Sequence, residues 1–225
     1  MKVLIAGLGS IGRRHLRNLR KVGIQDVIAY RVRGNDIPEM DEHPLPVYGS
    51  LATALAQKPD IVFVTNPTSL HLEVALAAAR QGCHLFIEKP LSHTLKSVDE
   101  LIDITTTNGS VAMVGCNFRF HPALQQIQRL LVAGSLGRVI TARGHAGEFL
   151  PGWHPDEDWR LGYSARKELG GGVILTLIHE LDYAYWLFGP VRKVFAQAGG
   201  WGGLDLDVED TAAILLEHRS QSRVS

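Results

Sequence analysis

The segment "VLIAGLGSIG", Val3–Gly12, decides how the first half of this chain folds. A short β-rich run leads into three glycines with G-x-G-x-x-G spacing, and a helical pattern follows at once. In that context Gly7 permits a tight turn, Gly9 lets the backbone approach a pyrophosphate, and Gly12 lets helix and strand pack closely. The free N–H groups of the helix N-terminus would face the anion. The predicted binding residues of this loop are Gly7, Gly9, Ser10, Ile11 and Gly12. The alternative, glycines that serve only a turn, stays open.

Strand-like and helix-like segments alternate through residues 1–118. The predicted strands are "KVLIA", "DVIAYRV", "DIVFVTN", "HLFIEK" and "VAMVGCN". Strands that are apolar on both faces and alternate with helices are typical of a parallel sheet covered on both sides. We therefore predict an α/β fold, a Rossmann-type doubly wound sheet that binds a dinucleotide, over residues 1–118.

The pattern changes over residues 119–225. We predict a helix at 121–134, a long strand at 138–149, a helix at 173–189, and strands at 191–199 and 209–219. Longer strands without intervening helices indicate an antiparallel open sheet, hence a second α+β domain for substrate binding or oligomerisation. The sequence stops soon after a strand, which would leave an unpaired edge. We expect a truncated second domain, or a sheet completed by another chain.

Composition excludes several classes of protein. The 225 residues carry a formal net charge of +0, which argues against broad nucleic-acid binding. No run approaches the roughly 20 apolar residues of a membrane helix, and the apolar start is too short for a signal peptide. Cys83 and Cys116 have no ligand-like spacing and are expected to be buried thiols in the reducing cytoplasm. "HELD" lacks the second histidine of a zinc motif, so we expect no metal.

The tip of the second predicted strand, "AYRVRGN", bears on the coenzyme. An acid there would bind the ribose 2′-hydroxyl of NAD. Instead the tip carries Arg31 and Arg33, whereas Asp26 lies too early and Asp36 lies beyond it. A guanidinium pairs well with a 2′-phosphate, so NADP is favoured over NAD. Alternatively, both arginines are solvated charges at a strand end.

The segment "FIEKPLS" ends the fourth predicted strand with two opposite charges. At the carboxyl edge of a parallel sheet, Glu88 and Lys89 would point into the ligand crevice. Pro90 favours an extended Lys89, which aims the ammonium group. That group could stabilise an alkoxide as hydride leaves the carbon, with Glu88 holding it charged or binding the cofactor. The alternative is a solvated ion pair in a turn.

Five motifs in order carry a resemblance to a known family. "GLGSIG", "TNPTSLH", "EKP", "NFRFHP" and "GGG…HELD" resemble the glucose–fructose oxidoreductase/inositol dehydrogenase/MocA family, and the likeness runs over essentially the whole chain. It implies a nicotinamide-dependent dehydrogenase or reductase acting on a sugar or sugar derivative, including nucleotide sugars and surface-polysaccharide precursors. It also implies a homo-oligomer formed through the sheet of the second domain.

The resemblance implies roles for matching positions. Lys89 would be catalytic, and His179 would be the acid/base group. Asp182, on the same helical face, could orient His179. The cofactor crevice would be lined by Asn66, Pro67, His71, Glu88 and Asn117, and a "WR" pair near the active site matches Trp159 and Arg160.

The sequence departs from the family pattern in two ways. Members commonly carry an aspartate three or four residues before the histidine, where this chain has Thr176 and Leu175. The chain is also shorter than its relatives. These departures keep open a second hypothesis, a truncated or degenerate dinucleotide-binding module, redox-sensing or purely binding, with little catalysis.

Overall fold

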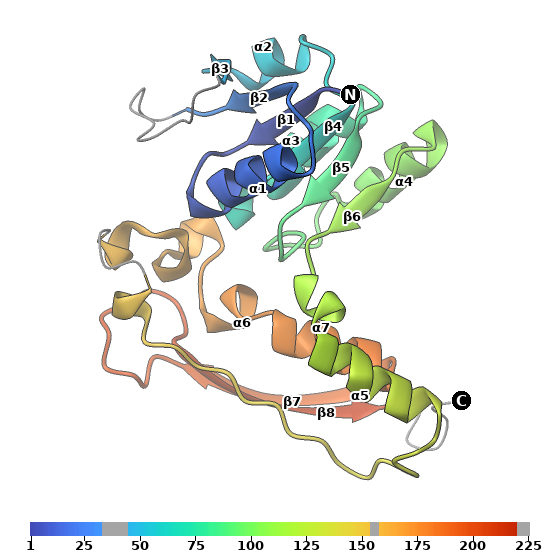
Figure 1. Ribbon diagram of the computed structural model, residues 1–225. Coiled ribbons are helices and arrows are strands. Elements are labelled where there is room, and N and C mark those ends of the chain that lie inside the picture. Colours follow the sequence, from blue (N-terminus) through green and yellow to red (C-terminus); the bar gives the residue numbers. More distant parts are fainter. Residues whose placement is uncertain (33–44, 154–157, 220–225) are drawn as a thin grey trace. The chain divides into compact units, whose positions relative to one another are not determined.

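The computed structural model describes residues 1–32, 45–153 and 158–219 (Figure 1). The chain divides into two compact units, Met1–Gly115 and Cys116–Ser225, and each unit is described by itself. None of the helices in these described ranges is both long enough and apolar enough to cross a membrane.

The first unit is built on one parallel sheet. Its strands are β1 (Val3–Ala6), β2 (Val27–Tyr30), β3 (Val47–Tyr48), β4 (Ile61–Val64), β5 (His84–Ile87) and β6 (Ala112–Val114). Their order is β3-β2-β1-β4-β5-β6, and every neighbouring pair is parallel. The two-residue β3 is too short to give a sequence pattern, and we did not predict it.

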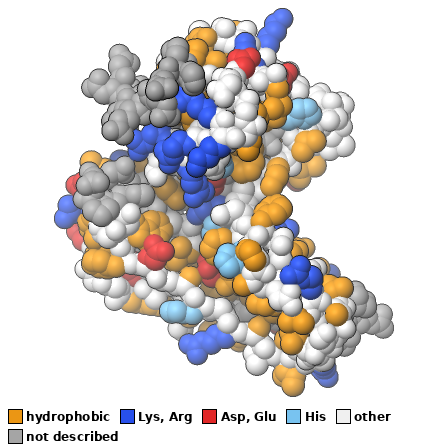
Figure 2. All heavy atoms as spheres, in the orientation of Figure 1, with side chains coloured by type: hydrophobic (Ala, Val, Ile, Leu, Met, Phe, Trp, Pro, Cys, Tyr) orange, Lys and Arg blue, Asp and Glu red, His pale blue; other side chains and the backbone are white. Residues whose placement is uncertain are grey.

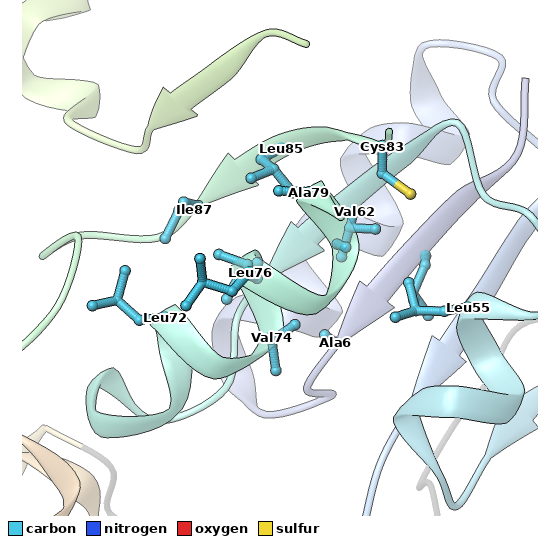
Figure 3. Packing of buried hydrophobic residues seen from close by; sticks show 14 of the residues in the cluster. Ala6, Leu55, Val62, Leu72, Val74, Leu76, Ala79, Cys83, Leu85 and Ile87 are labelled. Atoms are coloured by element: carbon cyan, nitrogen blue, oxygen red, sulfur yellow. The ribbon is translucent and has the colours of Figure 1, made fainter. Parts of the chain in front are cut away.

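Alternation along the strands gives this sheet two apolar faces. The helices are α1 (Ser10–Lys21), α2 (Leu51–Leu55), α3 (His71–Ala79) and α4 (Val98–Asn108). Leu4 and Ala6 join the core beneath α2, α3 and α4, whereas Val3 and Ile5 join the core beneath α1. Figure 3 shows the larger of the two clusters, with Leu72 and Leu76 of α3 packed toward the strands. Burial on both faces explains the continuously apolar strands.

The second unit is a small α+β layer. It contains α5 (Pro122–Val132), α6 (Val173–Thr176), α7 (His179–Phe188), β7 (Val191–Gly199) and β8 (Thr211–His218). Short 3₁₀ turns lie between these elements: η2 (Asn117–Phe120), η3 (Leu150–Gly152), η4 (Trp159–Leu161), η5 (Tyr163–Ala165) and η6 (Lys167–Leu169). β7 and β8 pair antiparallel, with Val194 opposite Leu216. A doubly wound parallel sheet followed by a smaller α+β unit confirms the predicted fold class.

Two expectations for the second unit were wrong. Residues 138–149 form no strand, because β7 and β8 pair only with each other in the described sheet and offer this segment no ladder. Its side chains are largely exposed, Ile140 to 84%. The single helix expected at 173–189 is two helices, α6 and α7, since the backbone leaves helical geometry at Leu177 (φ −101°, ψ 39°).

Candidate active site

The glycine loop joins β1 to the N-terminus of α1. Gly9 is the N-cap residue, and no side chain caps the first turn of α1, which contains no acidic residue. Added side-chain volume at Gly9 would meet no atom within 4 Å. The amide groups at this helix end are therefore left without a side-chain cap, and no carboxylate of the first turn competes for them.

Gly7 and Gly12 hold the loop against the sheet. A Cβ at Gly12 would lie 2.0 Å from the Gly7 carbonyl oxygen, and one at Gly7 would lie 2.7 Å from the Asn66 nitrogen. Gly7 also has φ +109°, a conformation that side chains disfavour. The Thr65 hydroxyl donates to the Gly7 carbonyl at 2.7 Å. The loop thus lies beside the end of β4, where the strand order reverses and doubly wound sheets bind ligands.

The segment after β4 contains a buried acceptor. The side-chain oxygen Oδ1 of Asn66 is buried and has no hydrogen-bond partner within the described parts of the chain. Pro67, which follows it, is the N-cap of the short turn η1 (Thr68–Leu70) before α3. A buried acceptor without a partner is costly unless a ligand or water completes it.

The ring of His71, the first residue of α3, faces two backbone carbonyl groups. Its Nδ1 lies 2.9 Å from the Pro90 carbonyl oxygen, and its Nε2 lies 2.9 Å from the Asn66 carbonyl oxygen. Only 2% of the residue is exposed. Burial lowers the pKa of His71, against the opposing effects of both carbonyls and the charge of Glu88. The geometry therefore gives His71 a role in joining two backbone segments.

Glu88, directly after β5, is held by a histidine that sequence reasoning missed. Its Oε1 lies 2.7 Å from Nε2 of His15 on α1. The His15 ring packs on Phe63 and Phe86, with centroid separations of 5.3 Å and 5.0 Å. Burial, the largest influence, raises the pKa of Glu88. The hydrogen bond and charge of His15, with the Lys89 N–H and the charge of Arg14, bring that pKa below its ordinary value. Glu88 is therefore ionised at neutral pH.

Lys89 follows Glu88 at the same edge of the sheet. Its backbone N–H donates to Oε2 of Glu88 at 3.2 Å, and its peptide bond to Pro90 is cis. The side chain is half-buried. The sequence motif thus places Lys89 directly after a buried carboxylate at the carboxyl end of β5.

The two arginines predicted to select the coenzyme are described only in part. Arg31 directly follows β2, and its N–H donates to the Tyr48 carbonyl at 3.0 Å. Arg33 and Asp36 lie outside the described residues. Figure 2 shows Lys and Arg side chains gathered on this face of the first unit. The described part of this strand end therefore carries one of the two predicted arginines, Arg31.

In the second unit, His179 and Asp182 lie on the first turn of α7. The ring of His179 stacks on Phe118, with centroids 4.3 Å apart and an interplanar angle of 8°. Both carboxylate oxygens of Asp182 bind Arg119, at 2.9 Å and 2.6 Å. The Asp182 hydrogen bond and charge raise the pKa of Arg119, despite its partial burial. Asp182 therefore holds η2 to α7.

The other expected residues of the second unit lie at its surface. Asn117 begins η2 and is exposed. The guanidinium carbon of Arg160 lies 5.1 Å from the centre of the Trp159 ring. Asp158 accepts a 3.1 Å bond from the Arg160 N–H, which caps η4. Asp158, Trp159 and Arg160 thus form one local cluster.

A cavity of about 150 Å³ also lies in the second unit. Its lining includes Trp153, Thr176 and Glu209. The Trp153 Nε1–H is buried and has no hydrogen-bond partner among the residues described. The cavity is thus lined in part by a residue whose indole N–H is buried and unsatisfied within the described structure.

The first unit fits a dinucleotide. The uncapped helix end and the open space at Gly9 suit a pyrophosphate. No group of His, Cys, Asp and Glu side chains in the described residues is arranged to hold a metal ion.

Family models match both units. A model described as "Oxidoreductase family, NAD-binding Rossmann fold" matches residues 1–116, and one for the GFO/IDH/MocA C-terminal domain matches residues 124–225. The chain belongs to the GFO/IDH/MocA oxidoreductase family. This confirms the resemblance drawn from the motifs.

Among the GFO/IDH/MocA relatives are two dehydrogenases of sugars and cyclitols. Myo-inositol 2-dehydrogenase of Thermotoga maritima is 30% identical over 98% of this chain and 66% of its own length. D-glucoside 3-dehydrogenase of Escherichia coli is 32% identical over 71% of this chain and 49% of its own. The chain thus spans about half to two thirds of these relatives' length.

Solved GFO/IDH/MocA structures share the fold. The WlbA dehydrogenase of Bordetella pertussis, in complex with NADH and UDP-GlcNAcA, superposes with a TM-score of 0.81 at 20% identity. That match covers 97% of this chain and 64% of the WlbA chain.

Sequence reasoning missed three residues that contact predicted site residues within the two units. They are His15, Phe118 and Arg119. His15 follows the glycine loop by one helical turn, and Phe118 and Arg119 lie inside the quoted "NFRFHP" motif. Their positions were available, but nothing local indicated what each would contact.

Proposed function

We propose that this protein transfers a hydride between a nicotinamide coenzyme and a secondary hydroxyl of a sugar or sugar derivative. The observation that carries the proposal is the placement of Lys89 beside the ionised Glu88 at the carboxyl end of β5. That edge of the sheet also bears the glycine loop and Asn66. The named activities of the relatives support the same reaction class.

The first unit would hold the coenzyme along this edge. The amides at the start of α1 bind the pyrophosphate, and Asn66 Oδ1 binds near the nicotinamide end. Arg31, together with Arg33, pairs with a 2′-phosphate, which makes NADP the preferred coenzyme over NAD. When bound, the nicotinamide accepts or supplies the hydride.

Lys89 would stabilise the charge that develops on the substrate oxygen, and His179 would transfer the hydroxyl proton. As hydride leaves a secondary alcohol, negative charge builds on its oxygen, and the Lys89 ammonium stabilises that charge. The His179 imidazole takes the hydroxyl proton as general base and returns it in the reverse direction. Stacking on Phe118 fixes the plane of the His179 ring, and the Arg119–Asp182 pair fixes the η2 turn that carries Phe118.

The second unit would supply substrate contacts and an oligomer interface. The buried Trp153 Nε1–H can donate to a sugar hydroxyl in the 150 Å³ cavity. The β7–β8 layer carries exposed apolar side chains, among them Val194 (63% exposed), Phe195 (65%) and Leu215 (71%). These side chains support a homo-oligomer that forms through this sheet. Neither cysteine is in a disulfide, which supports a cytoplasmic protein.

Turnover of a panel of cyclitols, glycosides and nucleotide sugars with NAD(H) and NADP(H) tests the proposal. Lys89→Met should lower turnover by about 100-fold or more while coenzyme affinity stays nearly unchanged, because a transition-state interaction is lost. His179→Ala should flatten the pH dependence of turnover near neutrality. Lys96→Met, at an exposed position in the following loop, is the matched control. Tight coenzyme binding without turnover of any panel member would instead support a dinucleotide-binding module.

A further inference from the structure

Two histidines from two different helices contact the residues on either side of Lys89. Nε2 of His15, on α1, lies 2.7 Å from Oε1 of Glu88, and Nδ1 of His71, on α3, lies 2.9 Å from the backbone carbonyl oxygen of Pro90. Neither contact involves the Lys89 side chain. Together the two imidazoles enclose the Glu88-Lys89-Pro90 turn from both sides.

The contact on the Glu88 side has a defined direction. Glu88 is an ionised carboxylate and can only accept, so the hydrogen lies on Nε2 of His15. The other carboxylate oxygen accepts the Lys89 N–H at 3.2 Å. His15 itself is fixed by the Phe63 and Phe86 rings, which stack on each other with centroids 4.8 Å apart. A chain of contacts therefore runs from α1 through Glu88 to the backbone of Lys89.

The contact on the Pro90 side also reaches the neighbouring loop. Both ring nitrogens of His71 face carbonyl oxygens, of Pro90 and of Asn66, at 2.9 Å. A neutral imidazole donates to one of them, and an imidazolium donates to both. Glu88 is the charged group whose field reaches this ring. His71 thereby ties the turn after β5 to the loop after β4 that carries Asn66.

We propose that His15 and His71 are positioning residues that together fix the direction of Lys89. Neither needs to touch coenzyme or substrate, since each acts through backbone or carboxylate groups next to Lys89. The effect on turnover rests on the proposed function, whereas the effect on the turn itself does not. A catalytic group displaced by about 1 Å can lose on the order of 100-fold in rate, so such supports matter to catalysis.

Four variants separate the contacts. His15→Gln keeps an N–H donor near Nε2, and His15→Phe keeps a ring without one. His71→Asn keeps a donor near Nδ1, facing Pro90, whereas His71→Gln keeps a donor near Nε2, facing Asn66. Leu76→Ala is the control, because Leu76 is a buried core residue of α3 whose apolar side chain takes no part in these hydrogen bonds.

Amide hydrogen exchange of the full chain, followed by NMR, reports on the two loops. The reporters are the Lys89 N–H, bonded to Glu88, and the Leu70 N–H, bonded to the Pro67 carbonyl at 2.9 Å. His15→Phe and His71→Gln should speed exchange at Lys89 by about tenfold or more and spare Leu70. His71→Asn should do the reverse, and Leu76→Ala should favour neither site.

Kinetics then test the consequence for catalysis. His15→Phe and His71→Gln should lower kcat about 10- to 100-fold, with the coenzyme Kd changed by less than about threefold, and His15→Gln should recover most of the loss. Unchanged exchange at Lys89 in both variants would overturn the proposal, as would an unimpaired kcat despite a loosened turn. If exchange changes as expected but no sugar is turned over, the positioning of the Lys89 turn by His15 and His71 is supported and the proposed function fails.

A measurement on the unaltered protein tests the proposal even where a variant does not fold. Nitrogen-15 NMR of the imidazoles should show His15 protonated at Nε2 at neutral pH. A His15 whose Nε2 lacks its hydrogen at that pH could not donate to Glu88 and would contradict the proposal.

Discussion

Arg119 and Asp182, 63 positions apart in sequence, form a bidentate ion pair in which Nε and Nη2 of Arg119 each donate to one carboxylate oxygen of Asp182. The pair joins the turn η2 to the helix α7. Phe118 of that turn stacks on His179 of that helix, so the pair supports the ring contact of the expected acid/base residue.

Removing this pair should loosen the second unit. Asp182→Ala should lower the free energy of unfolding by about 1 to 2 kcal/mol, at the lower end for charge-assisted bonds because Arg119 is partly exposed. Arg119→Lys should lose more than half as much stability as Asp182→Ala, since lysine cannot bind both carboxylate oxygens at once. Urea denaturation measures both variants. Equal stability of Arg119→Lys and the unaltered chain would show that bidentate binding contributes nothing.

Substitutions at two glycines of the loop should differ in their effect on stability. Gly12→Ala places a Cβ 2.0 Å from the Gly7 carbonyl, so it should cost about 1 to 3 kcal/mol of stability and abolish coenzyme binding. Gly9→Ala meets no protein atom and should leave stability within about 0.5 kcal/mol. It should still weaken the coenzyme on the order of tenfold, because the methyl group enters the pyrophosphate space. Denaturation and calorimetric titration measure the two effects, and retained affinity in Gly9→Ala would place the pyrophosphate elsewhere.

Coenzyme choice should follow the arginines after β2. The double change Arg31→Ala and Arg33→Ala should weaken NADP(H) far more than NAD(H), because each lost charge-assisted contact is worth about 1.5 to 3 kcal/mol. Arg17→Ala, on the exposed face of α1, is the control and should affect both coenzymes alike. Calorimetry with all four coenzyme forms decides the matter. Equal losses for NAD(H) and NADP(H) in the double variant would remove the argument for NADP.

Stability should fall with acid in two stages. The pKa of His71 lies below its ordinary value of 6.5, so its stabilising contribution is complete above that pH and is lost as the pH falls through the folded-state pKa. The pKa of Glu88 lies below 4.5, so its contribution is lost only below that pH.

Glu88→Gln separates the two stages. It should flatten the pH dependence of unfolding free energy below about 4.5 and leave the His71 stage in place. Denaturation midpoints between pH 3 and pH 8 provide the test. An acid limb identical to that of the unaltered chain would show that Glu88 is not held ionised by the fold.

The sequence by itself determined the parts of this protein that depend on short stretches of chain. Glycine spacing between a strand and a helix specified the loop, because backbone approach and turn geometry are local requirements. Apolar runs alternating with helices specified the parallel sheet, and "EKP" specified which strand end carries Lys89. The same motifs identified the family.

Only the tertiary structure decided which distant side chains meet. His15 and Glu88 are 73 positions apart, and no pattern near either residue encodes their contact. His71 was predicted to line the crevice, yet both its nitrogens meet backbone carbonyls, since a helix start buries whichever side chain faces the neighbouring loop. Residues 138–149 carry a strand-like pattern but form no strand, because a β-ladder needs a partner and not only a propensity. Local patterns set backbone conformation, whereas pairing depends on how elements far apart in sequence pack together.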